Sequence, residues 1–270
     1  MKRKVNYNLY IGMFIVTVIL FIVILSFFWT PFDPNLINAK NKFLSPNAEY
    51  LLGTDNFGRD ILSRIMQGSK NVFLIGVTSV GIGLFGGLIL GSISGYFGGW
   101  IDDVIMRLVD AMIAIPGILF AIMLISIFDA GLINTIIALG VPRIAPFTRV
   151  IRGNFLQVKT KDFVKASIMK GSSHLHIIRH HILPNIINQT AVAMTLSFSS
   201  TILSEAGLSY LGLGVQPPDA SWGRMLSEAK PYLMKAPWYI ISVGVVITSM
   251  VLGFNLLGDG LRKYSEKRKW

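Results

Sequence analysis

Six apolar segments constrain the fold of this chain more than any other feature. A helix needs about 20 consecutive apolar residues to cross a bilayer whose hydrocarbon core is about 30 Å thick. We therefore expect membrane-spanning helices at about residues 9–29, 72–93, 104–128, 132–150, 186–206 and 238–257. The composition agrees, since 52% of the residues are hydrophobic and only 14% are charged, as is typical of a membrane protein. The sequence thus predicts an all-α membrane protein with six transmembrane helices.

The first apolar segment follows Lys2, Arg3 and Lys4, as the apolar part of a signal peptide would. It is too long for a signal peptide and lacks a small-residue cleavage site, so we expect a retained helix. The chain then divides into an N-terminal cytoplasmic end with the first helix, an extracytoplasmic loop, a core of five helices and a basic cytoplasmic tail. These four parts cover residues 1–30, 31–70, 71–260 and 261–270.

Basic residues predict the orientation of the chain in the membrane. They gather at residues 2–4, in the stretch 149–185 and in the tail 262–270. Lys and Arg are retained on the cytoplasmic side of membrane proteins, and six spans place all three clusters on one side. We therefore expect both termini in the cytoplasm of a prokaryote, a multi-pass protein of the cell membrane and a surrounding lipid bilayer. The same topology explains the net charge of +11 without nucleic acid as a partner.

The stretch 149–185 predicts a cytoplasmic knob made of two helices. Its apolar residues first recur at roughly helical spacing, Gly171 interrupts the pattern, and Ser172 or Ser173 can cap a second helix. Pro184 is expected to end that second helix, because proline lacks an amide hydrogen. Such a knob would dock to a soluble partner. The alternative is a basic helix that lies on anionic lipid.

Several small features add detail to the expected helices. The span at 72–93 is rich in glycine, which favours close packing against neighbouring helices, because lipid supplies no hydrophobic drive between them. Pro116 predicts a kink inside the span at 104–128. Asp60 can cap the helix that leads into the second span. We find no ionisable residue near a bilayer centre, which speaks against an ion-driven carrier that works alone.

Motifs of enzymes and metal sites are missing from the sequence. There is no phosphate-binding Gly-x-x-x-x-Gly-Lys-Ser/Thr loop, no His-Glu-x-x-His zinc motif and no Gly-x-Ser-x-Gly nucleophile turn. The chain has no cysteine. His176 and His180 stand four apart on a helix, as a metal pair could, but solvated histidines of a docking surface are the simpler interpretation. We expect no catalytic residue, no metal site, no cofactor and no enzymatic activity.

Three strings in the sequence are specific enough to indicate a protein family. One runs from Leu52-Gly-Thr-Asp to Gly58-Arg-Asp-Ile-Leu-Ser-Arg64, and another from Gly95-Tyr-Phe-Gly-Gly-Trp to Met106-Arg-Leu-Val-Asp110. The most specific is Leu208-Ser-Tyr-Leu-Gly-Leu-Gly-Val-Gln-Pro-Pro218 with Ser221-Trp-Gly223. These strings resemble the permeases of ABC importers, specifically the second-permease type of the peptide/opine/nickel branch, and the resemblance covers almost the whole chain.

The knob resembles the EAA loop of those permeases. Lys165, Ala166 and Ser167 stand where the family has Glu-Ala-Ala, so a lysine replaces the acid. Gly171 stands at the family's glycine. The string His181-Ile-Leu-Pro-Asn185 matches the end of the loop. The resemblance implies an ATPase-coupling loop formed by Lys165, Ala166, Ser167, Gly171, His181, Leu183 and Pro184.

The resemblance also implies a fold, partners and a substrate class. The fold would be that of type I ABC importer permeases, with a cytoplasmic coupling helix. The partners would be a second homologous permease, two cytoplasmic ATPase subunits that hold the ATP site, and an extracytoplasmic substrate-binding protein. The outer segment would contact that binding protein or form the entrance through Tyr210, Gln216, Asp219 and Trp222, with Tyr210 and Trp222 as exposed aromatics; a passive cap on the bundle is the alternative.

The implied activity is ATP-driven import of oligopeptides or dipeptides. Import of nickel or of a metal–chelator complex is the alternative within the family. An ion-driven secondary carrier is the remote alternative from another class.

Overall fold

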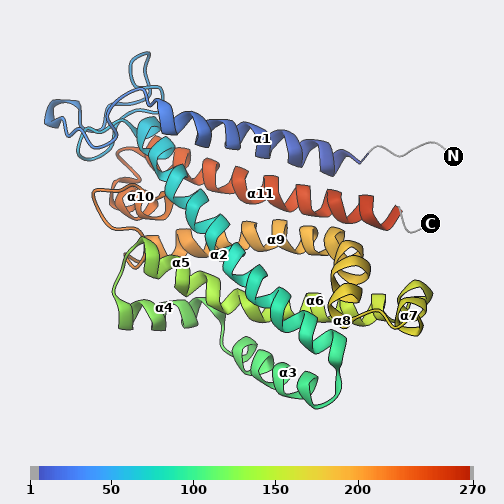
Figure 1. The fold of residues 1–270 in the computed structure, drawn as a ribbon. Helices are drawn as coiled ribbons and strands as arrows, with labels where there is room; N and C mark the ends of the chain where they lie inside the picture. Colours follow the sequence, from blue (N-terminus) through green and yellow to red (C-terminus); the bar gives the residue numbers. More distant parts are fainter. Residues whose placement is uncertain (1–5, 268–270) are drawn as a thin grey trace.

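The computed structural model describes residues 6–267, without the side chains of the last three, and shows a bundle of helices (Figure 1). No β-strand occurs within that range. Lys2, Arg3 and Lys4 of the predicted basic N-terminus, like residues 268–270, lie outside the described residues. The elements, in chain order, are α1 Tyr7–Phe28, η1 Ala39–Asn41, α2 Ile61–Phe97, α3 Gly99–Ala114, α4 Gly117–Phe128, α5 Leu132–Gly140, η2 Val141–Arg143, α6 Ile144–Lys159, α7 Asp162–Met169, α8 His174–His176, η3 Ile177–Ile182, α9 Leu183–Tyr210, α10 Trp222–Ala229, η4 Lys230–Tyr232 and α11 Pro237–Lys267.

Four helices in the described part of the chain are long and apolar enough to cross a membrane, which makes this a multi-pass membrane protein. They are Tyr7–Phe28, Ile61–Phe97, His174–Tyr210 and Pro237–Tyr264. A fifth span is present if the bent pair α3–α4 crosses as one. The remaining predicted span, 132–150, is divided between α5, η2 and α6, so the count of six stays a prediction.

The span predicted at 104–128 is not one kinked helix. It consists of α3 and α4, which meet at an angle of 84°. Pro116 explains the break, because its ring disfavours helical geometry in the residue before it. Ile115 is accordingly extended, with φ −90° and ψ 122°.

The prediction that Pro184 ends a helix is wrong. Helical geometry continues from His174 to Tyr210 through α8, η3 and α9. The segment η3 is π-helical, and the N–H of Leu183 donates to the carbonyl of Ile178. This wider turn lies immediately before Pro184, where an α-helix would bring the proline ring against the preceding turn. The wider π-helical turn therefore accommodates the proline ring, and the helix continues past Pro184.

Glycines bring α2 into direct contact with η2 and α6, in line with the predicted close packing of this span against its neighbours. A Cβ on Gly83 would lie 2.6 Å from the Cβ of Arg143, and one on Gly95 would lie 2.6 Å from the Cβ of Phe155. The two glycines between them in this register, Gly87 and Gly91, are similarly close to α6. Only residues without a side chain permit this approach. In Figure 1, α2 crosses the other long helices diagonally, which lets it contact several of them.

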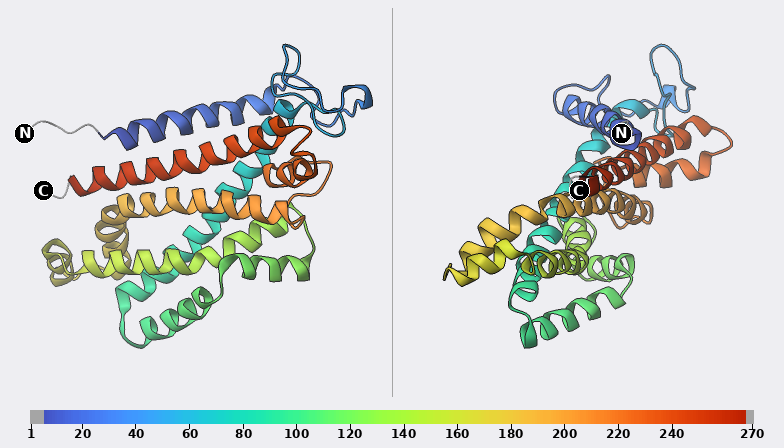
Figure 2. Two further views of the ribbon diagram at one scale, coloured as in Figure 1. Left: turned by 180° about the vertical axis from the view of Figure 1, so that it is seen from behind. Right: turned by 90° about the vertical axis from the view of Figure 1, so that its right-hand side faces the viewer.

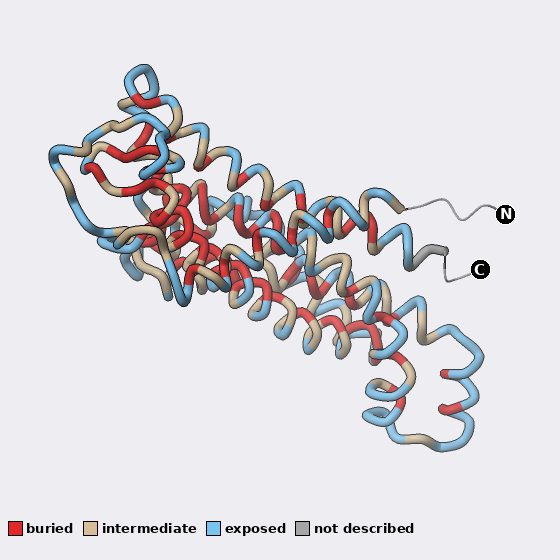
Figure 3. The backbone as a smooth tube through the Cα atoms, turned by 90° about the horizontal axis from the view of Figure 1, so that it is seen from above, coloured by how far each residue is buried: buried red, intermediate tan, exposed pale blue. Residues whose placement is uncertain are grey.

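The two ends of the bundle differ. The start of α1, the end of α11 and the short helix α7 lie at one end, while residues 31–60 and α10 lie at the other (Figures 1 and 2). Buried residues concentrate where the helices meet (Figure 3). The segment with α7 and α8 projects away from the bundle in the right-hand view of Figure 2. The predicted knob and the two ends of the described chain thus share one side.

Candidate coupling and translocation sites

The projecting part of the predicted knob, residues 160–185, has a glycine corner. Gly171 has φ +78°, and its N–H donates to the carbonyl of Ile168 at 2.9 Å. The N–H of Ser172 donates to the carbonyl of Ser167 at 3.2 Å. This pair of bonds is typical of a helix that ends at a residue with positive φ. The position where a Cβ of residue 171 would stand has no atom within 4 Å, so the backbone angle alone requires glycine.

Side chains tie the knob to the rest of the bundle. Val164 of α7 is fully buried in the same core as Ile177 and Ile182 of η3. Ser173 caps α8, as predicted, by accepting from the N–H of His176. The hydroxyl of Tyr96, at the end of α2, bonds to Nδ1 of His174 at 2.8 Å. The knob is therefore in direct contact with η3 and with the end of α2.

The knob exposes both apolar and basic side chains. Four large apolar side chains are exposed, and Met169 is the most exposed of them at 86%. The others are Phe163, Ile168 and Leu175. Four basic residues of the same segment are exposed as well: Lys161, Lys165, Lys170 and Arg179. Such side chains fit a partner that offers apolar and acidic groups.

The predicted coupling residues are not all exposed. Lys165, Ala166, Gly171 and Pro184 are exposed, whereas His181 and Leu183 are half-buried. Ser167 is buried, and its hydroxyl bonds to that of Ser172 at 3.0 Å. Ser167 is thus positioned to hold the glycine corner together and not to touch a partner.

Three histidines of the knob, His176, His180 and His181, lie close together. The rings of His176 and His180 stack at 4.4 Å between centroids. Residues 6–267 contain no group of three potential metal ligands. The stacked pair is exposed, in line with the solvated alternative.

Ion pairs at the opposite end of the bundle account for the charged residues of the string 52–64. Asp55 accepts from Nε of Arg59 at 2.6 Å, and Arg64 lies 3.7 Å from Asp55 and 3.6 Å from Glu228. Arg224 also pairs with Glu228, at 3.2 Å. Asp60 caps α2 by accepting from the N–H of Ser63, as predicted. The string thus folds the outer segment onto α10.

The predicted outer contact residues are separated by the fold. Trp222 is buried, with 1% of its surface exposed, and its Nε1–H donates to the carbonyl of Ile65 at 3.0 Å. The expectation of an exposed Trp222 is therefore wrong, because the indole packs against α2. Tyr210 and Gln216 are half-buried, which also removes Tyr210 as an exposed aromatic, and only Asp219 is exposed.

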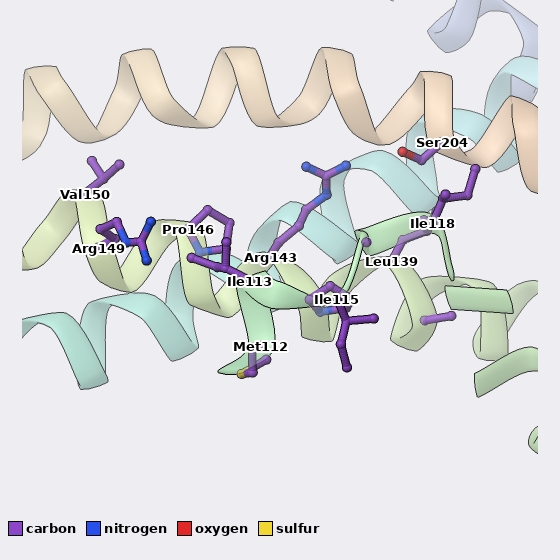
Figure 4. Close-up of a pocket in the computed structure, with 13 residues that line it drawn as sticks. Met112, Ile113, Ile115, Ile118, Leu139, Arg143, Pro146, Arg149, Val150 and Ser204 are labelled. Carbon is purple, nitrogen blue, oxygen red and sulfur yellow. The ribbon is translucent and has the colours of Figure 1, made fainter. Parts of the chain in front are cut away.

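A cavity of about 550 Å³ opens beside the break between α3 and α4. Arg143 extends from η2 toward α9, and its Nη1 donates to the hydroxyls of Ser197 at 3.1 Å and Ser200 at 2.9 Å (Figure 4). Ser204 lines the same space. Sequence reasoning did not single out Arg143 as a site residue, although an arginine between Pro142 and Pro146 in an apolar segment was an available signal.

Comparisons with known proteins agree on one family. Residues 87–270 match the family of the binding-protein-dependent transport system inner membrane component. The chain is 39% identical over 261 residues to the dipeptide transport system permease protein DppC of Alkalihalophilus pseudofirmus, covering 97% of this chain and 86% of that one. It is 40% identical over 265 residues to DppC of Haemophilus influenzae, covering 96% and 90%. The glutathione transport system permease protein GsiD of Pectobacterium atrosepticum is 40% identical over 217 residues, covering 80% and 72%.

Solved structures agree on the fold. A chain of the MetNI methionine ABC transporter, in inward-facing conformations, superposes with a TM-score of 0.62 at 18% identity, covering 74% of this chain and 94% of that one. A chain of an amino acid ABC transporter with histidines gives 0.56 at 17% identity, covering 77% and 93%. At this identity the likeness concerns the fold alone, and it supports the expected ABC importer permease fold.

Proposed function

Because the chain belongs to the family of binding-protein-dependent transport system inner membrane components, we propose that it is the permease subunit of an ATP-driven importer of dipeptides or other short peptides. The observation that carries this proposal is the identity of 39–40% to two dipeptide permeases over almost the whole chain. The family consists of membrane components of transport systems and not of enzymes, so ATP hydrolysis belongs to partner subunits.

The partners follow from the kind of importer. A second homologous permease completes the path across the membrane, two cytoplasmic ATPases dock beneath the pair, and an extracytoplasmic binding protein delivers the peptide. The knob supports an ATPase contact, because it exposes the apolar Met169 together with basic residues such as Lys165. In this arrangement the knob, the start of α1 and the end of α11 face the cytoplasm, and the outer segment with Asp219 faces the binding protein.

The knob couples the ATPases to the membrane helices mechanically. Closure of the ATPases displaces α7, and the displacement passes through Val164 to η3 and through His174 to Tyr96 of α2. The close α2–α6 contact lets those helices move together. A docking partner that binds two states differently shifts the balance between inward- and outward-open forms.

Nickel or a metal–chelator complex is a less favoured cargo. The relatives named above are dipeptide and glutathione permeases, and no cluster of metal ligands occurs among residues 6–267. An ion-driven carrier that works alone is not supported, because the family works with a binding protein.

Reconstituted transport tests the proposal. The chain, its second permease, the ATPases and the binding protein would be placed in proteoliposomes, and uptake of labelled dialanine would be followed with and without ATP. We expect uptake only with ATP and binding protein, and no competition by nickel. Uptake of nickel without uptake of dialanine would refute the peptide assignment.

A further inference from the structure

Arg143 occupies an unusual place for a charged residue. It lies near the middle of the helical stretch formed by α5, η2 and α6, and it bonds to Ser197 and Ser200 near the middle of α9. A charge at that depth is costly unless it faces other protein, a water-filled path or a bound ion. Arg143 therefore needs a further partner, which could reach it from the cavity that it lines together with Ser204 of α9.

The bonds that the structure gives to Arg143 leave its charge uncompensated. Its two acceptors are neutral hydroxyls, and its Nε is buried without a hydrogen-bond partner. No carboxylate within residues 6–267 forms an ion pair with it. Arg149 in the same cavity is different, because it pairs with Asp110 at 2.6 Å. Arg143 thus keeps free capacity for an anion.

The cavity next to Arg143 has the size and lining of a small-molecule site. Its volume of about 550 Å³ lies within the range of about 300–1,000 Å³ that is common for ligand pockets. Most of the wall is apolar, and Arg143, Arg149 and Ser204 supply the polar groups. Figure 4 shows the guanidinium of Arg143 and the hydroxyl of Ser204 on the side of the cavity toward α9.

We propose that this cavity forms part of the translocation path and that Arg143 binds the terminal carboxylate of the transported peptide there. The inference rests on the proposed peptide import. A guanidinium forms strong, charge-assisted hydrogen bonds with a carboxylate. Ser197 and Ser200 hold the guanidinium in position, and apolar wall residues such as Met112 and Leu139 contact the peptide side chains. The second permease covers the side of the cavity that this chain leaves open. The polar groups of Arg143, Arg149 and Ser204 therefore do not face lipid.

The absence of cysteine from the chain provides a direct test. Ser204→Cys places the only thiol of this subunit in the cavity. The complete importer would be treated in proteoliposomes with either 2-sulfonatoethyl methanethiosulfonate, an anion, or 2-trimethylammonioethyl methanethiosulfonate, a cation. The label on this subunit would be quantified after gel separation. We expect the anion to react about tenfold faster than the cation, as a cationic site steers anions.

Further variants test whether Arg143 causes the faster reaction with the anionic reagent. In the Ser204→Cys background, Arg143→Gln should remove the preference, and saturating dialanine should slow labelling only while Arg143 is present. Arg107→Gln is the matched control, since Arg107 is an exposed arginine of α3 that does not line the cavity. A thiol that neither reagent reaches, or a preference that survives Arg143→Gln, would overturn the inference.

Transport provides a separate readout. With the native Ser204, Arg143→Gln should lower dialanine uptake about tenfold, the worth of one lost charged hydrogen bond, while the ATPases still co-purify. Arg143→Lys keeps the charge but not the planar fork, so it should restore only part of the uptake. Wild-type rates in Arg143→Gln would refute the inference and leave peptide import intact. A native importer that takes up no dialanine, yet keeps the anion preference, would instead refute the proposed function.

Discussion

Gly95 of α2 and Phe155 of α6 lie in such close contact that a Cβ on residue 95 would stand 2.6 Å from the Cβ of Phe155. Phe155 is itself fully buried. Helices in lipid associate through packing of this kind, because no hydrophobic drive separates them from the lipid chains. The contact joins α2, which bonds to the knob through Tyr96 and His174, to α6, which leads into the knob.

Gly95→Val should destabilise the protein, because the new side chain forces α2 away from Phe155. Overpacking of this kind costs about 1–3 kcal/mol, which should appear as a lower unfolding temperature of the purified protein in detergent. Gly81→Ala is the control, since a Cβ at residue 81 meets no atom within 4 Å. Equal unfolding temperatures for Gly95→Val and Gly81→Ala would contradict the close-packed interface.

Gly171→Val should disturb the knob and leave the membrane helices in place. A side chain at φ +78° costs about 1–2 kcal/mol for an L-residue, and a β-branched one costs more. We expect normal membrane insertion, weak co-purification of the ATPases and loss of peptide uptake. Gly171→Asn should be milder, because asparagine tolerates this backbone region.

Gly153→Val serves as the control for the knob. Gly153 lies within α6, has no atom near the position of its Cβ, and does not need positive φ. This variant should keep most of its ATPase binding. Normal ATPase recovery and uptake with Gly171→Val would show that the knob is not the coupling element.

Glu228→Gln should destabilise the outer end of the bundle. Glu228 lies close to Arg59, Arg64 and Arg224, and the side chain of Arg64 is only 2% exposed. Loss of the carboxylate leaves the buried guanidinium of Arg64 with Asp55 and the carbonyl of Pro34, so the loss should stay below the cost of a fully broken buried pair, about 3–5 kcal/mol. Thermal unfolding would measure the loss.

The matched control for that network is Glu49→Gln, because Glu49 is exposed in the same outer segment and forms none of these ion pairs. It should change the unfolding temperature little. A similar, small shift for both variants would mean that the network contributes nothing measurable.

Reporter fusions test the predicted orientation. Fusions after Lys161 and Trp270 should both report a cytoplasmic location, since the knob and the end of α11 share one end of the bundle (Figure 1). A fusion after Asn47, in the segment at the opposite end, should report the outside. A cytoplasmic signal at Asn47 together with an external one at Lys161 would reverse the topology.

Many structural features of this protein could be predicted from residues that are close together in its sequence. Long apolar runs required helices that cross a membrane, the glycines of α2 required a close neighbour, and Gly171 required a turn with positive φ. Asp60 and Ser173 capped the helices that follow them, as their side chains allow. The resemblance of the outer strings and the knob pointed to the permease family, which the comparisons confirmed. Each of these features depends on residues that are near one another in the chain.

Tertiary structure alone decided the features that depend on distant partners. From the sequence Trp222 was expected to be an exposed loop aromatic, but its indole bonds to the carbonyl of Ile65 in α2. Arg143 likewise finds its partners, Ser197 and Ser200, only on the distant helix α9. The helix continues through Pro184 for a more local reason, the π-helical turn Ile177–Ile182 that precedes it. For Trp222 and Arg143 the physical reason is common: burial and hydrogen bonding are set by groups that the chain brings together only on folding, and no local pattern encodes which groups these are.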